Sequence, residues 1–178
     1  MIFLMDHGDY LVDILDAKGH VVAQKPRPSV NKRLDRYRTV HVLMLTPAGE
    51  LVLSQISERQ DLPNIYARRL GTTVATIRRS GENAERAARR ALEREIFLRA
   101  VPVRVLGEGT LDLDDGLQAY VNAFWAQGGP PEHYSTVDIE SLKSMSVPRF
   151  EAALRANPER FAPTLRAIWG HWGTRLAG

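Results

Sequence analysis

The chain has 178 residues, which fits one domain over residues 1–178 better than two and allows a core that needs no metal or disulfide staple. Its 44% apolar and 25% charged residues exclude a disordered or fibrous chain, and its net charge of +3 excludes a histone-like polycation. The absence of cysteine excludes thiol nucleophiles, cysteine metal sites and disulfides, and it favours a reducing, cytoplasmic location.

The N-terminal third predicts an arm and two hairpins. Residues 1–9 are apolar for five positions and then acidic, which predicts a short strand or an ordered N-terminal arm; the apolar run is too short for a signal peptide or a membrane helix. The basic stretch 25–38 contains two prolines and predicts a loop or a short helix. The strands of the two hairpins are expected at residues 10–15 and 20–23, and at residues 39–45 and 51–56.

The middle of the chain predicts one clear helix between strands. A loop at 57–71 leads into a strand at about 70–77. The helix is expected to begin with Ser80 or Gly81 as its cap and to end near Leu98. Two further strands follow, around an acidic turn; they are residues 103–111 and 118–126.

The C-terminal third predicts two helices. One spans residues 147–156, with a proline in its first turn, and the other runs from Pro163 to about Leu176 within the C-terminal region 157–178. Trp169 and Trp172 are expected to be packing residues, with a contact in a homodimer as the alternative. The order of elements predicts an α/β fold, a mixed β-sheet with helices on both faces.

Residues 81–98 carry a family resemblance. Glu82 is followed after seven residues by Arg90, and then by Leu92, Glu95 and Leu98. This spacing resembles the Nudix box: a glycine, five residues, a glutamate, seven residues, then Arg-Glu-aliphatic-any-Glu-Glu-any-Gly-aliphatic. The resemblance implies a Nudix-like α/β/α sandwich and, in the family, hydrolysis of diphosphate compounds with Mg²⁺ or Mn²⁺.

The flanking segments extend the resemblance over most of residues 10–172. Residues 11–23, 38–56 and 61–66 are similar to the N-terminal half of the Nudix branch related to isopentenyl diphosphate isomerase, and residues 157–163 are similar to a stretch near its end. Isomerase chemistry itself is not expected, because the chain has no cysteine and Tyr37 stands where the isomerase metal histidine would fall.

The resemblance places three metal-binding carboxylates at positions 91, 94 and 95, where this chain has Ala91, Arg94 and Glu95. Carboxylates at such spacing share one helix face and hold a hard cation against a diphosphate. An arginine about 4 Å from a metal is repelled by about 4 kcal/mol per unit charge at an effective dielectric of about 20. We therefore expect any Mg²⁺ or Mn²⁺ to bind weakly and metal-dependent hydrolysis to be weak or lost.

Several carboxylates remain as candidates. Glu95 and Arg90 are the candidate catalytic residues, and Glu95 with Glu82 and Glu85 is the candidate metal set. The alternative is structural: Glu95 held by Arg90 or Arg94, and ion pairs between residues four apart on the helix. Those expected pairs are Glu82–Arg86, Glu85–Arg89 and Arg89–Glu93. His41 is either a ligand or base, or a core residue of an apolar strand.

Arginines concentrate around the same helix. Residues 61–104 contain ten arginines against five acidic residues, whereas the rest of the chain has a small negative surplus. The candidate phosphate-binding residues are Arg68, Arg69, Arg78, Arg79 and Arg94, since a guanidinium can grip a phosphate in two places without a metal. The alternative is a solvated basic face.

Three functions are therefore open. The first is binding of a nucleotide or another small phosphorylated metabolite, with hydrolysis weak or lost. The second is an active Nudix hydrolase of a nucleoside-diphosphate-type substrate, using Glu95, Glu82 or Glu85, and a later acid such as Glu132, Asp138 or Glu140. The third is a basic module that binds RNA or a protein, although no aromatic-interleaved basic motif supports nucleic acid. No membrane partner is expected.

Overall fold

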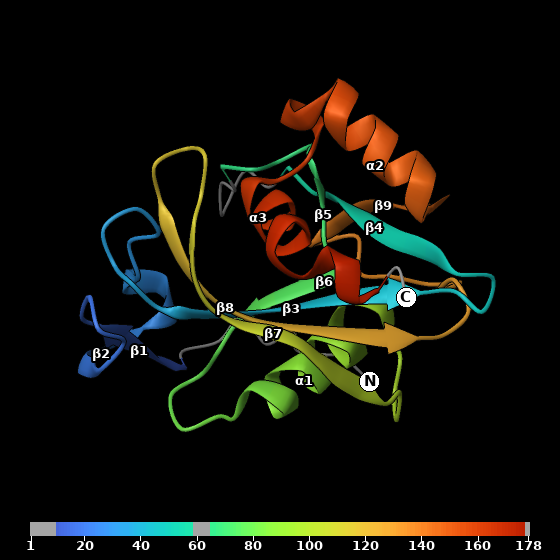
Figure 1. Ribbon diagram of the computed structural model, residues 1–178. Helices are drawn as coiled ribbons and strands as arrows, with labels where there is room; N and C mark the ends of the chain where they lie inside the picture. The colour runs from blue at the N-terminus through green and yellow to red at the C-terminus, as the bar shows by residue number, and fades with distance from the viewer. Residues whose placement is uncertain (1–9, 59–64, 177–178) are drawn as a thin grey trace.

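The computed structural model describes residues 10–58 and 65–176 of the chain (Figure 1). The strands are β1 (Leu11–Leu15), β2 (Val21–Pro26), β3 (Arg38–Leu45), β4 (Glu50–Ile56), β5 (Leu70–Gly71), β6 (Val74–Ile77), β7 (Val103–Asp112), β8 (Gln118–Gln127) and β9 (Ile139–Ser146). The helices are α1 (Ala84–Ile96), α2 (Val147–Ala156) and α3 (Pro163–Trp172), with short 3-10 helices at Arg27–Ser29, Pro158–Arg160 and Gly173–Arg175. The predicted arm at 1–9 and the middle of the predicted 57–71 loop lie outside the described residues.

The strands form a small sheet and a large one. Strands β1 and β2 pair as the predicted hairpin. The large sheet has seven strands in the order β5-β4-β3-β8-β7, with β6 paired to β3 and β9 paired to β4. Strands β3 and β8 run parallel, while the β3–β4, β3–β6, β4–β9 and β7–β8 neighbours run antiparallel. The sheet is therefore mixed, as the order of elements predicts.

Helices cover both faces of the large sheet. Figure 1 shows α1 on one side and α2 with α3 on the other. The core beneath α1 joins its alanines and Leu92 to apolar side chains of β3 and β8. The opposite core includes Trp169 and Trp172, each 8% exposed, so both tryptophans are packing residues. The α/β/α sandwich is confirmed.

The sheet splits where β3 and β4 diverge. These strands are in register at Met44–Val52 and Leu45–Leu51, and then residues 70–77 separate them. Strand β5 pairs with β4, and β6 pairs with β3. At the crossing, the Thr73 hydroxyl accepts the Met44 N–H at 2.8 Å and donates to the Val52 carbonyl, so these backbone groups stay paired. The single strand predicted at 70–77 is therefore two strands.

Helix α1 begins later than the sequence predicts. Asn83, not Ser80 or Gly81, is its cap: the Asn83 side chain accepts the Arg86 N–H at 2.8 Å. The last helical residue is Ile96, because Phe97 adopts a left-handed conformation with φ of 56°. Glu82 thus lies before the cap, outside the helix, so helical spacing does not set the direction of its side chain.

Two other differences concern the C-terminal third. Strand β9 is not predicted, because its sequence, Ile-Glu-Ser-Leu-Lys-Ser-Met-Ser, is mostly polar and partly exposed. Helix α3 ends at Trp172 and gives way to a 3-10 turn, four residues before the predicted end. Among the described residues, no helix is long and apolar enough to cross a membrane.

Candidate functional site

The main cavity lies where β3 and β4 diverge and has a volume of about 320 Å³. Its walls come from strands β3 and β6, the segment 27–39, the loop before β9 and the turn between β7 and β8. A smaller cavity of about 150 Å³ adjoins it and shares His41, Ala75 and Asp138 with it. Arg94 lines the main cavity, and Glu95 lines the smaller one, which we call the inner cavity. The last turn of α1 therefore lies at the junction of the two cavities.

Arg94 and Glu95 form an ion pair at this junction. Arg94 Nη2 donates to Glu95 Oε1 at 2.5 Å, and Glu95 is 4% exposed. The other carboxylate oxygen, Oε2, accepts the Ala75 N–H of β6 at 3.4 Å. Burial raises the pKa of Glu95 to about 7; the Arg94 charge opposes this rise and the Asp138 carboxylate adds to it.

The loop before β9 brings Asp138 to the same place. The Ser135 N–H donates to the Glu95 carbonyl at 2.7 Å, which ties this loop to the end of α1. The Ser57 N–H donates to the Asp138 carbonyl at 3.1 Å, which ties it to the end of β4. Asp138 lines both cavities, and its charge acts on both Arg94 and Glu95. Glu132 and Glu140, the other later acids suggested by the sequence, are exposed and do not line either cavity.

His41 is a neutral group in the wall of both cavities. Its Nδ1 lies 3.0 Å from the Thr72 hydroxyl, which donates its hydrogen to the Val74 carbonyl at 3.1 Å. Nδ1 must therefore donate to Thr72, and Nε2 is left as an acceptor. Burial lowers the pKa of His41 to about 4, so the ring is uncharged near neutral pH. The sequence left two interpretations open for His41, a ligand or base and a core residue of a strand. In the structure, His41 is hydrogen-bonded within strand β3 and also lines both cavities, so the role of ligand or base stays a prediction.

Arg90, in the middle of α1, and Glu82, just before its cap, form a second pair. Arg90 donates from Nε and Nη2 to the two Glu82 oxygens at 2.8 and 2.9 Å, and the side chains are 17% and 12% exposed. Arg90 also donates to the Thr76 hydroxyl and the Ile77 carbonyl. Arg90 thus holds Glu82, not Glu95, and neither Glu82 nor Arg90 lines a cavity.

The helix-spacing predictions for the other acids are correct in one case of three. Glu85 pairs with Arg89 at 2.7 Å on the exposed face, as predicted. The Glu82–Arg86 prediction is wrong because Glu82 turns back to Arg90. The Arg89–Glu93 prediction is wrong because Glu93 pairs with Arg99, just beyond the helix, at 2.7 Å.

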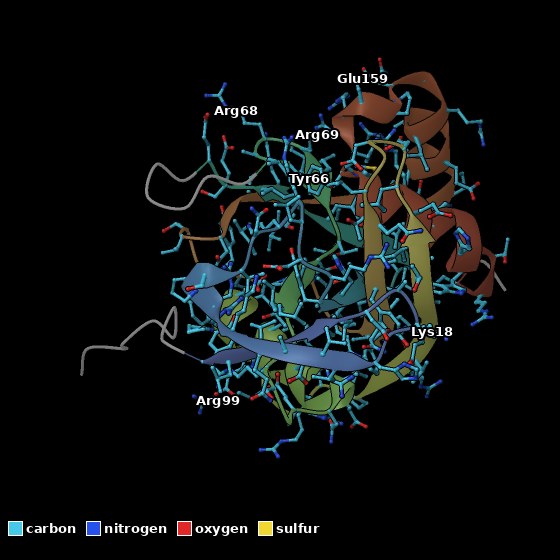
Figure 2. The ribbon with its side chains drawn as sticks, turned by 90° about the vertical axis from the view of Figure 1, so that its left-hand side faces the viewer. Lys18, Tyr66, Arg68, Arg69, Arg99 and Glu159 are labelled. Atoms are coloured by element: carbon cyan, nitrogen blue, oxygen red, sulfur yellow. The ribbon has the colours of Figure 1, made fainter. Side chains whose placement is uncertain are left out.

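The four arginines before the helix do not form one clamp. Arg68 pairs with Glu58, and the Arg69 guanidinium lies 5.9 Å from the Tyr66 ring centre; Figure 2 shows both at one end of the molecule, with Arg99 far from them. Arg78 donates to the Glu82 carbonyl at 2.5 Å. Arg79 lies over the ring of Tyr10, and Tyr10 lines the main cavity. Burial and the charges of Arg90 and Arg94 lower the pKa of Arg79.

Sequence reasoning missed the aromatic part of the cavity. Tyr37 and Tyr66 line it together with Leu113 and Leu117 of the β7–β8 turn. The Tyr66 hydroxyl donates to the Asp115 carboxylate at 2.6 Å, and burial with this carboxylate raises the Tyr66 pKa. Arg166 of α3 pairs with Asp114 of the same turn. No sequence pattern could reveal these contacts, because they join segments about 50 residues apart.

The residues at the end of α1 do not fit a divalent cation. Ala91 is fully buried in the core beneath the helix and offers no oxygen. Arg94 directs a guanidinium at the carboxylate of Glu95, which would otherwise be a ligand. The structure keeps Glu82 and Glu85 away from Glu95, in their own ion pairs. Over residues 10–58 and 65–176, no group of three or more acidic or histidine side chains is placed to hold a metal ion.

The chain matches no protein-family model and no curated protein. Its fold is similar to several solved structures. One is a protein of Deinococcus radiodurans, described as a hypothetical Nudix protein (TM-score 0.68, 20% identity, 82% of this chain and 89% of that chain covered). The Nudix hydrolase RenU of M. smegmatis has a TM-score of 0.57 at 18% identity, with 96% of each chain covered. A Nudix hydrolase of Nitrosomonas europaea has a TM-score of 0.56 at 17% identity, covering 75% of this chain and 85% of that chain. At these identities the likeness concerns architecture: this chain has the fold of the Nudix hydrolases.

Proposed function

We propose that this protein binds a small phosphorylated ligand, such as a nucleotide, in the cavity between β3 and β4, with metal-dependent hydrolysis weak or lost. The observation that carries the proposal is the position of Arg94. Its guanidinium lines the cavity, while its partner Glu95 is buried behind it in the inner cavity. Guanidinium groups bind phosphate oxygens with directed hydrogen bonds as well as charge.

The charge balance of the main cavity supports an anionic ligand. Arg27, Lys32 and Arg94 line it with Asp35 and Asp138. Asp35 is already neutralised, because Lys25 donates to both of its oxygens at 2.7 and 2.9 Å. These contacts hold the pKa of Asp35 below its ordinary value. Over the whole wall of the main cavity, the three cationic side chains therefore outnumber the two carboxylates, and one of those carboxylates is already paired with Lys25.

The rest of the wall suits the non-phosphate part of such a ligand. Tyr37 and Tyr66 offer aromatic rings, and Leu113 and Leu117 offer apolar surface. The volume of about 320 Å³ lies in the range of small-molecule sites. A ligand with one charged end and one flat apolar part fits this distribution.

We also propose that the chain belongs to the Nudix superfamily, in the branch related to isopentenyl diphosphate isomerase, with a degenerate Nudix box. The fold likeness supports superfamily membership. The burial of Ala91 in the core and the pairing of Arg94 with Glu95 support the degenerate box, since neither residue supplies a ligand oxygen. Sequence similarity in the flanking segments supports the branch.

The test is a binding titration with a cavity-filling variant. Ala75 is exposed in the wall of both cavities, so Ala75→Phe fills the site without burying a new group in the core. Ala23→Phe on exposed strand β2 is the matched control. ADP and inorganic pyrophosphate are titrated by calorimetry into each protein in EDTA. We expect binding by the wild type and Ala23→Phe, weakened about tenfold or more in Ala75→Phe.

Two results would overturn this proposal. One is the absence of binding by the wild type across a panel of nucleotides and sugar phosphates. The other is equal affinity in Ala75→Phe and the wild type, which would place the ligand elsewhere. RNA binding that falls steeply with salt would instead favour the basic module, for which the paired and dispersed arginines of the structure give less support.

Active hydrolysis is the second candidate, favoured by the fold shared with solved hydrolases and by the closeness of Glu95 and Asp138. It is tested separately, by release of phosphate from nucleoside diphosphate compounds with Mn²⁺ or Mg²⁺. Phosphate release by the wild type that Glu95→Gln abolishes would establish hydrolysis. It would also reject the proposal that metal-dependent hydrolysis is weak or lost. No release beside clear binding would leave the binding function standing.

A further inference from the structure

We propose that the Arg94 guanidinium is the built-in cation of this site: it neutralises Glu95 and Asp138, holds the ligand's anionic group directly, and keeps a divalent cation out. The part about the ligand rests on the proposed function. The part about the metal does not, because it concerns three side chains of the chain itself.

The first step is the charge arrangement. Glu95 and Asp138 come from α1 and from the loop before β9, and both line the inner cavity. Burial and, to a smaller extent, repulsion by the Asp138 carboxylate raise the Glu95 pKa, while both carboxylates favour the charged form of Arg94. The guanidinium therefore has the electrostatic role of a cation that is attracted by two carboxylates and is hydrogen-bonded to one of them.

The second step is that Arg94 is held in place but not saturated. Nη2 is engaged with Glu95 at 2.5 Å, and the side chain is 21% exposed toward the cavity. Nε is buried and has no hydrogen-bond partner among the described residues. Buried donors are normally paired, so the Arg94 guanidinium still requires one further hydrogen-bond acceptor. An anionic oxygen satisfies that requirement, whereas a cation does not.

The third step is what the site becomes without the guanidinium. Two carboxylates would then line one small cavity without the guanidinium, and oxygen donors are the ligands of Mn²⁺ and Mg²⁺. The loop carrying Asp138 would stay beside Glu95, because backbone hydrogen bonds from Ser135 and Ser57 hold it. Removal of one positive charge should thus turn a metal-excluding site into a metal-binding one.

The experiment measures Mn²⁺ binding by calorimetry and by electron paramagnetic resonance. The proteins are the wild type, Arg94→Gln, the double variant Arg94→Gln with Glu95→Gln, and the control Arg89→Gln on the exposed face of the same helix. We expect Arg94→Gln to bind Mn²⁺ at least about tenfold more tightly than the wild type and Arg89→Gln, and the double variant to lose that gain. Equal Mn²⁺ affinity in Arg94→Gln and the wild type overturns the proposal.

A second variant keeps the test decisive if Arg94→Gln does not fold. Mn²⁺ is then titrated into the wild type and Glu95→Gln, for which the proposal predicts the same weak binding. Tighter binding by the wild type than by Glu95→Gln would show that Glu95 already holds a metal beside Arg94, and the proposal would fail.

The ligand part is tested with inorganic pyrophosphate in EDTA. We expect Arg94→Lys to keep part of the affinity, because it keeps the charge but loses the directed donors of the guanidinium, and Arg94→Gln to lose about tenfold or more. If pyrophosphate binds the wild type but Arg94→Gln binds it equally well, the Arg94 inference fails while the proposed function stands. If Mn²⁺ behaves as expected but no phosphorylated ligand binds the wild type, the proposed function fails and the built-in cation remains.

Discussion

Helix α1 contributes an arginine to each of two arginine–glutamate pairs, and the two pairs have opposite settings. From the middle of the helix, Arg90 donates to both oxygens of Glu82 and also to β6, and neither side chain lines the main or the inner cavity. At the end, Arg94 bonds to one oxygen of Glu95 and lines the cavity. The first pair has its hydrogen-bonding capacity used within the fold; the second keeps a donor for something else.

This difference shows how ion pairs of similar composition serve structure or ligand binding. The pKa of Glu82 is lowered, because the bonds from Arg90 and the Arg79 backbone outweigh its partial burial. The pKa of Glu95 is raised to about 7, because its burial outweighs the single Arg94 contact. A saturated pair stabilises the fold at neutral pH, whereas an under-satisfied buried pair is a place where a ligand can add stability.

The largest expected effect comes from breaking the first pair. Arg90→Gln leaves Glu82 as a carboxylate that is 12% exposed and has lost its guanidinium, so we expect the free energy of unfolding to fall by about 3 kcal/mol. Urea denaturation at pH 7 measures this loss. Arg90→Lys, which keeps the charge but not the two-point grip, should lose less. A loss below about 1 kcal/mol in Arg90→Gln would contradict the structural role assigned to this pair.

The second effect is a pH dependence at the cavity end. Glu95, with its raised pKa, makes stability fall as pH rises from about 4.5 to about 7. His41, with its pKa lowered from 6.5 to about 4, makes stability rise over about pH 4 to 6.5. The two contributions cancel between about pH 4.5 and 6.5 in the wild type.

Single substitutions should expose each contribution. Relative to the wild type, Glu95→Gln should gain stability as pH rises from about 4.5 to about 7, and His41→Gln should lose stability as pH rises through the same region up to about 6.5. Thermal melts across pH 4 to 8 measure both differences. Glu82→Gln is the contrasting control, since the stability that Glu82 contributes is lost as pH falls, not as it rises. If the stability of Glu95→Gln and of Glu82→Gln, each relative to the wild type, changed with pH in the same direction, the contrast between the Arg94–Glu95 and Arg90–Glu82 pairs would be wrong.

The sequence predicts helix α1 and the arginine at position 94 better than it predicts the contacts that other segments make with the helix. Apolar periodicity locates β3, β4 and α1, and the resemblance to the Nudix box marks position 94 as a place where an acid is expected and a cation stands. Asp138 could be named only as one of three later acids, because its place depends on a bond between Ser135 and Glu95, which are 40 positions apart. The Arg90–Glu82 pair spans eight residues, a spacing outside the helix rules, because Glu82 precedes the cap.

A third, smaller effect concerns the helix cap, which positions Glu82 beside Arg90. Asn83→Ala removes the acceptor of the Arg86 N–H, and we expect a loss of about 1 kcal/mol in the free energy of unfolding. Asn83→Ser should restore most of it, since serine caps as well as asparagine. Equal stability of Asn83→Ala and the wild type would mean that Arg90 alone fixes the start of the helix.

The smallest effect is expected on the exposed face, which supplies the baseline for the comparison. Glu85 and Arg89 are paired at 2.7 Å but are 58% and 47% exposed, so water and salt screen the attraction. Arg89→Gln should therefore change the free energy of unfolding by no more than about 0.5 kcal/mol, and less still in 0.5 M salt. Urea denaturation at two salt concentrations measures this. If Arg89→Gln proved as costly as Arg90→Gln, burial and two-point bonding could not explain the stability of the Arg90–Glu82 pair, and the contrast between the ion pairs of α1 would lose its physical basis.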